Sequence, residues 1–599
     1  MNIRSRKLLP VVAALWCAMP AGLAAQVAKT PTPAGAVIPS AVVRELPADQ
    51  QIIHALSRLT FGPKPGDVLR VRAIGLDKWI DQQLSPERID DSAMDVFVAR
   101  YPTINRDQNE LLRQYADQQR ERREVRRDRT DSSRALSTAD SMAMRREMQQ
   151  RFNLTRQVVT QLQSSRVARA VASERQLQEV MTDFWHNHFS VFAQKGPPEA
   201  YYLTDFDRSV IRPRALGKFR DLLGAVAQSP AMLFYLDNAR SMADRLNENY
   251  GRELLELHTL GADGGYTQKD VINVARAFTG WTIRPPQQGG GFIFRPRVHD
   301  AGEKIVLGHK LPAGRGMQDG EDVLDILARS PVTARFIATK IARRFVSDTP
   351  PKALVDRATQ VFLRTDGDIR EVVRSIITSP EFFSQRAFRS KVKSPFEVVV
   401  SATRALNAQP DSTPRTARVI AYLGQPIFGH QAPNGWPETG ESWMNTGAIL
   451  NRINFGMAAG AGQLPGITIK ALPALDTVRS ASREKQVDAV VAAILNGMVS
   501  PDTRAVLMSG EHPLLAKHVA TAGVPDVTQA PEPSMSQLDS RSEDAMDGSA
   551  ERRNTTRPNQ NAGGRRAAMQ GRAIGNLPPL TGLPQILGLA LGSPEFQRR

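Results

Sequence analysis

Cysteine is almost absent from this sequence: among 599 residues there is one, Cys17. It lies in an apolar N-terminal stretch that we expect to be removed on export, so the mature chain would contain none. A chain without cysteine forms no disulfide, no thiolate metal site and no cysteine nucleophile. The mature protein must then be stabilised by burial of apolar side chains, which its length permits.

Long apolar runs are missing too. Beyond the N-terminus no stretch approaches the roughly 20 apolar residues that cross a bilayer as a helix, so we expect no integral membrane span. The sequence also lacks a Gly-x-Ser-x-Gly elbow, a phosphate-binding Gly-Lys-Ser/Thr loop and a dinucleotide fingerprint. These absences count against the serine hydrolases and nucleotide-dependent enzymes that carry those motifs.

The N-terminus has the pattern of a secretory signal. Three basic residues precede an apolar run at residues 8–18, and small residues follow it. We expect a signal peptide over residues 1–25 and an Ala/Pro/Thr-rich linker over residues 26–47. No adjacent arginine pair is present, which favours the general secretory route. The expected location is periplasmic or extracellular.

The charge is strongly basic, with 78 Lys and Arg residues against 61 Asp and Glu residues and a formal net charge of +17. Such a charge favours contact with anionic material. Export makes an anionic envelope polymer the preferred partner and disfavours nucleic acid. The alternative is that the arginines only solvate exposed helices.

The spacing of apolar residues predicts a mainly α-helical fold, a large assembly of many helices. We expect a main helical domain at residues 48–455, with an arginine-rich surface insertion at 106–150. A glycine run followed by alternating apolar residues predicts a small β-hairpin or loop insertion near 281–311. A C-terminal helical part is expected at 456–599, with a disordered insertion at 530–575, where large apolar residues are few.

The segment at residues 174–192 carries the richest set of functional side chains, Phe-Trp-His-Asn-His-Phe at 184–189. Apolar residues recur there at steps of three and four, which predicts a helix with one buried face. His188 falls on this face, whereas His186 lies about 200° around the helix, beside Asp183. One helix therefore cannot bring both histidines to a single ion.

A second helix is predicted over residues 247–261, with Asn247 as its N-cap and Gly261 ending it in the left-handed conformation. His258 falls on its apolar side, and Glu253 lies on a separate polar stripe. A metalloprotease helix needs two histidines four residues apart, and this helix does not have them.

These residues suggest a divalent metal site. His188 and His258, on different helices, could meet in a helical bundle, with Glu253 or Asp300 completing the set and His186 as a further candidate ligand. Imidazole with carboxylate suits Zn, Fe, Mn or Cu. The alternative is that each is a core histidine hydrogen-bonded to a carbonyl or carboxylate group.

Two loops add candidates. Asp300 follows His299 directly and could orient it as a general base. Glu253 could itself act as a base or as a third metal ligand. Glu253 and Asp300 are therefore the candidate catalytic residues. A turn in which Asp300 bonds its own backbone before Gly302 is the alternative. Trp436, between Gly435 and Pro437, could stack on a sugar ring or could simply fill a packing gap.

The motifs together resemble the uncharacterised domain-of-unknown-function 1800 family of bacteria. The resemblance rests on the following segments: His54-Ala55-Leu56-Ser57-Arg58-Leu59-Thr60-Phe61-Gly62, Phe184-Trp185-His186-Asn187-His188-Phe189, Arg252-Glu253-Leu254-Leu255-Glu256-Leu257-His258-Thr259-Leu260-Gly261, Gly280-Trp281, His299-Asp300, Leu307-Gly308, Gly435-Trp436-Pro437 and Ser593-Pro594-Glu595-Phe596. It implies a large, exported, mainly helical protein, often encoded beside another exported protein that could be its partner. It implies no reaction.

Two functions follow as hypotheses. The first is a metal-assisted hydrolase or oxidase acting on an envelope or extracellular polymer, with Trp436 lining the substrate groove. The second is a non-catalytic periplasmic scaffold or binding protein that holds an anionic partner. Nucleic-acid binding is a less supported hypothesis than these two, because no recognition motif is present.

Overall fold

Helices dominate the computed structural model, as predicted. It describes residues 44–131, 138–196, 198–470, 472–511 and 580–599. The predicted signal peptide (1–25), most of the linker (26–47) and the predicted polar insertion (530–575) lie outside the described residues. None of the described helices is both long and apolar enough to cross a membrane. The described residues belong to one compact unit.

The N-terminal helices are short and amphipathic. They are α1 (Ala48–Leu59), α2 (Asp67–Ile74), α3 (Leu76–Gln83) and α4 (Ser92–Val98), with a 3₁₀ turn at Pro86–Arg88. In α1 the apolar residues recur at helical spacing and are buried, Ile52, Leu56 and Leu59 among them. This face packs onto α2 and α7 (Gln176–His188), which places α7 inside the fold.

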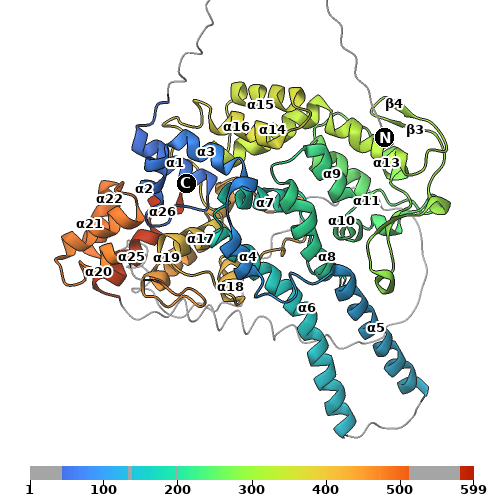
Figure 1. The fold of residues 1–599 in the computed structure, drawn as a ribbon, viewed down its shortest axis with the longest axis horizontal. Coiled ribbons are helices and arrows are strands. Elements are labelled where there is room, and N and C mark those ends of the chain that lie inside the picture. The colour runs from blue at the N-terminus through green and yellow to red at the C-terminus, as the bar shows by residue number, and fades with distance from the viewer. Residues whose placement is uncertain (1–43, 132–137, 197, 471, 512–579) are drawn as a thin grey trace, which may run out of the picture. The chain divides into compact units, whose positions relative to one another are not determined.

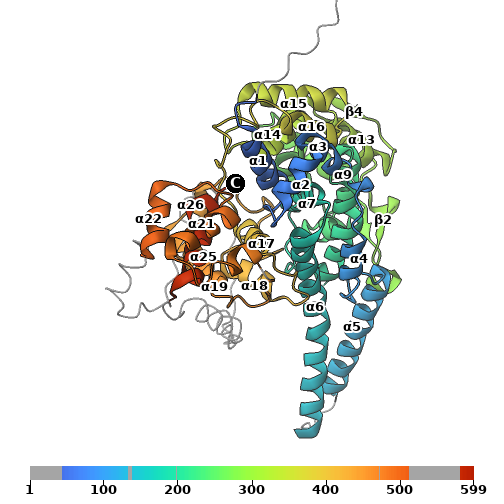
Figure 2. The ribbon, with the colours of Figure 1, turned by 60° about the vertical axis from the view of Figure 1, so that its left-hand side comes forward.

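The arginine-rich insertion is helical. It forms the long helices α5 (Gln108–Asp131) and α6 (Thr138–Ala172), which run side by side and project from the remaining helices in both views (Figures 1 and 2). The second half of α6 enters the body of the protein, where Val158, Leu162 and Val167 are buried. There it packs against α8 (Glu199–Asp205), α17 (Pro395–Ala405) and α18 (Arg415–Tyr422).

The central segment consists of short helices around α7. They are α8, α9 (Phe219–Ala227), α10 (Pro230–Tyr235), α11 (Asn249–Glu253) and α12 (Gln268–Ala277), with a π-helix at Phe206–Ile211 and 3₁₀ turns at Arg212–Arg214 and Asn238–Arg240. The helix predicted over 247–261 is α11 followed by a second π-helix at Leu254–Thr259. In it the N–H of Leu260 bonds the carbonyl of Leu255, five residues back. Within this π-helix Leu255 is buried and Leu257 is partly buried.

The β insertion near 281–311 is present as two small antiparallel hairpins. In the first, β1 (Trp281–Ile283) pairs with β2 (Phe292–Phe294); in the second, β3 (Lys304–Val306) pairs with β4 (His309–Leu311). A short 3₁₀ turn at Pro286–Gln288 lies between β1 and β2, and another at Pro296–Val298 lies between the two hairpins. Trp281 is fully buried against Phe278, so the first hairpin is anchored in the core.

The remaining helices complete the core. They are α13 (Gln318–Ala328), α14 (Pro331–Phe345), α15 (Lys352–Arg364), α16 (Ile369–Ile377), α17, α18, α19 (Thr446–Gly460), α20 (Pro473–Asp476), α21 (Arg483–Ile494), α22 (Pro501–Ser509), α25 (Gly582–Gly592) and α26 (Pro594–Gln597), with a 3₁₀ turn at Glu441–Trp443. Every residue of α17 is buried. The apolar α25 returns to pack on α19, α21 and α22. The domain boundary expected near residue 455 lies inside α19.

Candidate functional site

A pocket forms where α7, α14 and the start of α17 meet the loop over residues 425–443 and the last residue, Arg599. Its empty volume, including the part open to solvent, is about 1000 Å³. Two sequence-predicted residues line it, His186 and Trp436. One side of the pocket is rich in cations and the other in aromatic rings.

The cationic side is organised by one carboxylate. Glu397, in the first turn of α17, accepts a hydrogen bond from Arg344 of α14, and its Oε1 lies 3.1 Å from Nε of Arg599. Its other oxygen accepts from the backbone N–H of Ser394 in a capping box. Burial alone would raise the pKa of Glu397, but the two guanidinium groups hold it well below its usual range. Two cations therefore share one anion.

Both of these arginines keep N–H groups that no described residue satisfies. Nε of Arg344 and Nη1 of Arg599 are buried without a hydrogen-bond partner among the described residues. Arg599 is only 5% exposed, and burial lowers the pKa of its guanidinium to about 10, so it stays charged at neutral pH. Buried donors almost always have a partner, so these N–H groups point to an acceptor supplied from outside the described chain.

The aromatic side is built on Trp436. The ring of His430 lies 4.6 Å from that of Trp436 and the ring of Trp443 lies 6.0 Å from it, centroid to centroid. The side chain of Asn187, from α7, holds the Trp436 backbone in both directions: its Oδ1 accepts from the Trp436 N–H (2.7 Å) and its Nδ2 donates to the carbonyl (2.9 Å). All three rings remain partly exposed.

The turn before Trp436 requires glycine. Gly435 has φ +73°, and a Cβ placed there would lie 2.3 Å from the carbonyl oxygen of Asn187. The Gly-Trp-Pro motif and the Phe-Trp-His-Asn-His-Phe motif therefore fit directly together, which neither motif indicates alone.

Substituting Gly435 by alanine should displace Trp436 and lower the free energy of unfolding by about 2–4 kcal/mol, since left-handed strain and a backbone clash add. Gly265→Ala is the matched control: φ there is +77°, but nothing lies within 4 Å of the added Cβ. Urea denaturation measures both. Equal losses in the two variants would contradict the close approach of Gly435 to Asn187.

The loop that carries Trp436 also contacts the cationic side of the pocket, through Glu438. Glu438 forms an ion pair with Lys340 of α14 (2.5 Å), and its backbone carbonyl accepts from Lys391 (3.2 Å). Lys391 also pairs with Asp348, and burial together with Arg599 lowers its pKa to about 8. The two sides of the pocket are thus fixed relative to each other.

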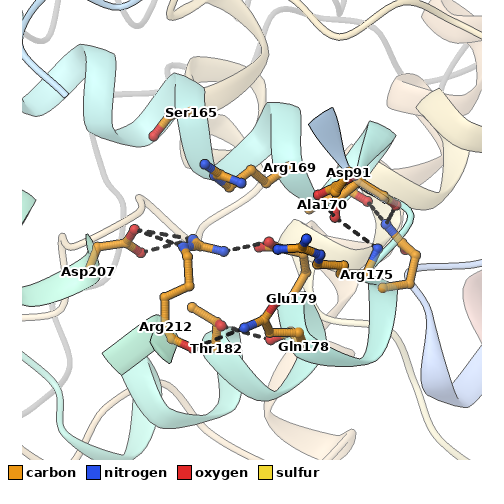
Figure 3. Close-up of polar contacts among 12 residues, drawn as sticks. Asp91, Ser165, Arg169, Ala170, Arg175, Gln178, Glu179, Thr182, Asp207 and Arg212 are labelled. Carbon is orange, nitrogen blue, oxygen red and sulfur yellow. Dashed lines mark hydrogen bonds and ion pairs between the residues drawn. The ribbon is translucent and has the colours of Figure 1, made fainter. Parts of the chain in front are cut away.

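His186 lines the pocket from a buried ionic network. Its Nε2 donates to Asp207 (2.8 Å). Arg212 links Asp207 to Glu179 of α7, as Figure 3 shows. Burial and the nearby charge of Arg166 lower the pKa of His186 to about 4, so its imidazole is neutral at pH 7. This network orients the ring and fixes α7 against the chain at 206–214.

His188 and His258 are buried together, as their apolar helical faces predicted. They are 3% and 1% exposed, and their ring centroids lie 6.2 Å apart. Nε2 of His188 donates to the backbone carbonyl of His258 (3.1 Å), which is the contact expected of a core histidine. Burial and nearby Lys340 lower the pKa of His258 to about 3. Among the described residues no group of three or more His, Cys, Asp or Glu side chains is arranged to hold a metal.

The candidate catalytic carboxylates lie outside the pocket lining. Both oxygens of Asp300 accept from Arg276 (2.7 and 3.0 Å), and Oδ1 also accepts from the Gly302 N–H, which is the turn considered as an alternative. Glu253 is half-buried, and burial together with neighbouring Glu256 raises its pKa. Metal binding by His186, His188 and His258, and catalysis by Glu253 or Asp300, stay predictions.

Five residues that line the pocket were not among the predicted site residues. Asn187 belongs to the Phe-Trp-His-Asn-His-Phe motif, in which only the histidines were considered as site residues. Ser394 and Glu397 match the Ser-x-x-Glu pattern of a capping box, which could have been read from the sequence. No local sequence pattern marks Arg344 or Arg599 as pocket residues, because their partner, Glu397, lies far from both along the chain.

Comparison with known proteins agrees with the motif resemblance. A family model described as a protein of unknown function, DUF1800, matches residues 54–598. Searches of curated proteins and of solved structures each found no match. The matched range includes every pocket-lining residue except Arg599. The chain belongs to the DUF1800 family of proteins of unknown function.

Proposed function

We propose that the protein is an exported binding protein for an anionic polymer and that it holds one acidic group of that polymer in this pocket. The observation that carries the proposal is the pair of buried, unsatisfied guanidinium N–H groups on Arg344 and Arg599. An acid oxygen is the acceptor that matches them best, because guanidinium groups recognise carboxylate, sulfate and phosphate through charge-assisted hydrogen bonds.

The charges around the pocket support an anionic ligand. Five cations line the pocket, Arg166, Lys340, Arg344, Lys391 and Arg599, against three carboxylates, Asp183, Glu397 and Glu438, so the lining carries a net positive charge. An uncompensated buried charge is costly, and a bound anion would remove that cost. The formal charge of +17 on the whole chain would also attract a polyanion from a distance.

The other hypothesis, a metal-assisted hydrolase or oxidase, has less support. Two of its candidate residues are engaged elsewhere, since His186 is bound to Asp207 and Asp300 to Arg276. The pair His188 and His258 is buried beside Lys340, whose positive charge opposes a cation.

The test is binding of dextran sulfate and of neutral dextran, measured by calorimetry with the full chain. Dextran sulfate should bind with an affinity that falls as salt is added, and dextran should not. Arg599→Gln should weaken binding about 10–100-fold, the loss expected when a buried charge-assisted hydrogen bond is removed. The exposed neighbour Arg598→Gln should change it little. Equal weakening by both variants would assign binding to the general basic surface and contradict the pocket.

A further inference from the structure

We infer that the anionic ligand is an acidic saccharide, with a sugar ring on Trp436 and its acidic group at Arg344 and Arg599. The inference rests on the proposed function and adds the chemical class of the ligand. Two features of the pocket would not be needed to bind a simple anion. One is the partly exposed aromatic side, and the other is the presence of carboxylates among the cations.

The aromatic side is shaped for a puckered ring rather than a flat one. The planes of His430 and Trp443 are inclined to that of Trp436 by 50° and 44°. Rings tilted in this way do not sandwich a planar base, but they can contact the C–H face of a sugar at several angles. Nε1 of Trp443 already donates to the carbonyl of Pro437, and Nε2 of His430 is bonded to Oδ1 of Asn434, so these two rings would meet a sugar through their faces.

Trp436, Arg344 and Arg599 line the same pocket. We therefore place the acidic group on the stacked sugar or on its neighbour in the polymer. A uronic acid or a sulfated sugar meets this condition.

The carboxylates of the pocket fit hydroxyl groups. Asp183 lines the pocket and is held by Arg166 (2.8 Å), and Glu438 is held by Lys340. Both are partly exposed and can accept hydrogen bonds from sugar hydroxyls. Gln425 and Ser190, which also line the pocket, add neutral donors and acceptors.

The experiment compares four probes on the full chain: tetragalacturonate, a neutral galactose tetramer, tetraglutamate and a uridine tetranucleotide. Calorimetry gives the affinity, and the difference in tryptophan emission between the wild type and Trp436→Phe isolates Trp436 from the other tryptophans, of which the sequence has six in total. We expect tetragalacturonate to bind at least tenfold more tightly than each of the others, with a change in tryptophan emission.

Variants locate the contact. Trp436→Ala should reduce tetragalacturonate affinity about tenfold, to the level of tetraglutamate, and Arg599→Gln should reduce both. Trp436→Phe keeps an aromatic ring and should bind with intermediate affinity, which separates loss of stacking from misfolding. Met444→Ala, an exposed change in the same loop, is the control.

The outcomes separate the two claims. If tetraglutamate binds as tightly as tetragalacturonate and Arg599→Gln weakens both, the saccharide inference fails and the anion-binding proposal stands. If the uridine tetranucleotide binds most tightly, the aromatic side recognises bases and the inference fails. If no anionic probe, dextran sulfate included, depends on Arg599, both claims fail.

Discussion

Replacing Glu397 by glutamine should lower the free energy of unfolding by about 3–5 kcal/mol, the loss seen when one partner of a buried ion pair is removed. Arg344 and Arg599 would then lie together in the pocket without their shared anion. Urea denaturation followed by circular dichroism measures the loss. The control is Glu371→Gln, whose partner Arg374 lies 3.5 Å away on a solvent-exposed helix face; that change should cost less than about 1 kcal/mol.

The same variant carries a second signature. In Glu397→Gln an added anion would meet two guanidinium groups that have lost their carboxylate, so dextran sulfate should stabilise the variant more than the wild type. Equal stabilisation of the two proteins would mean that the polyanion binds away from Glu397.

Replacing Arg212 by methionine should have an effect of similar size, about 3–5 kcal/mol. Arg212 is the cation between Asp207 and Glu179, both of which are buried, and it holds the pKa of Asp207 well below its usual range (Figure 3). Without it Asp207 keeps its hydrogen bond with His186, and Glu179 loses its ion pair with Arg212. The orientation of His186 in the pocket should loosen as a result.

The sign of the pH dependence makes the Arg212 prediction specific. In the variant, ionised Asp207 has lost the guanidinium that favours its charged form, so its folded-state pKa rises and protonation stabilises that state. The stability deficit relative to wild type should therefore shrink as the pH is lowered towards 4. Arg214→Met, in the same 3₁₀ turn, removes only hydrogen bonds to the backbone carbonyls of Ser209 and Val210 and should show neither effect.

Much of the fold was predictable, because local patterns determine helices. The three- and four-residue spacing at 174–192 predicted α7 and the burial of His188, and the glycine run at 289–291 marked the β insertion. The π-helix at Leu254–Thr259 was not predictable, since its wider turn depends on packing around it rather than on local spacing.

The pocket was predictable only in part. Trp436 was named as a ring that could stack on a sugar, with filling of a packing gap as the alternative, and it does line the pocket. Arg599 was missed because its partner, Glu397, lies about 200 residues earlier in the chain, and a single sequence does not pair distant charges. Asn187 was overlooked for the same reason: its contact with the Trp436 backbone joins segments 249 residues apart.

The most direct test of the central claim is a crystal structure of the full chain with a sulfated tetrasaccharide. We predict a sulfate oxygen about 2.7–3.0 Å from Nη1 of Arg599, the distance of a charge-assisted hydrogen bond. A sulfated tetrasaccharide bound instead along the arginine-rich helices α5 and α6, with no contact to Arg599, would contradict the claim.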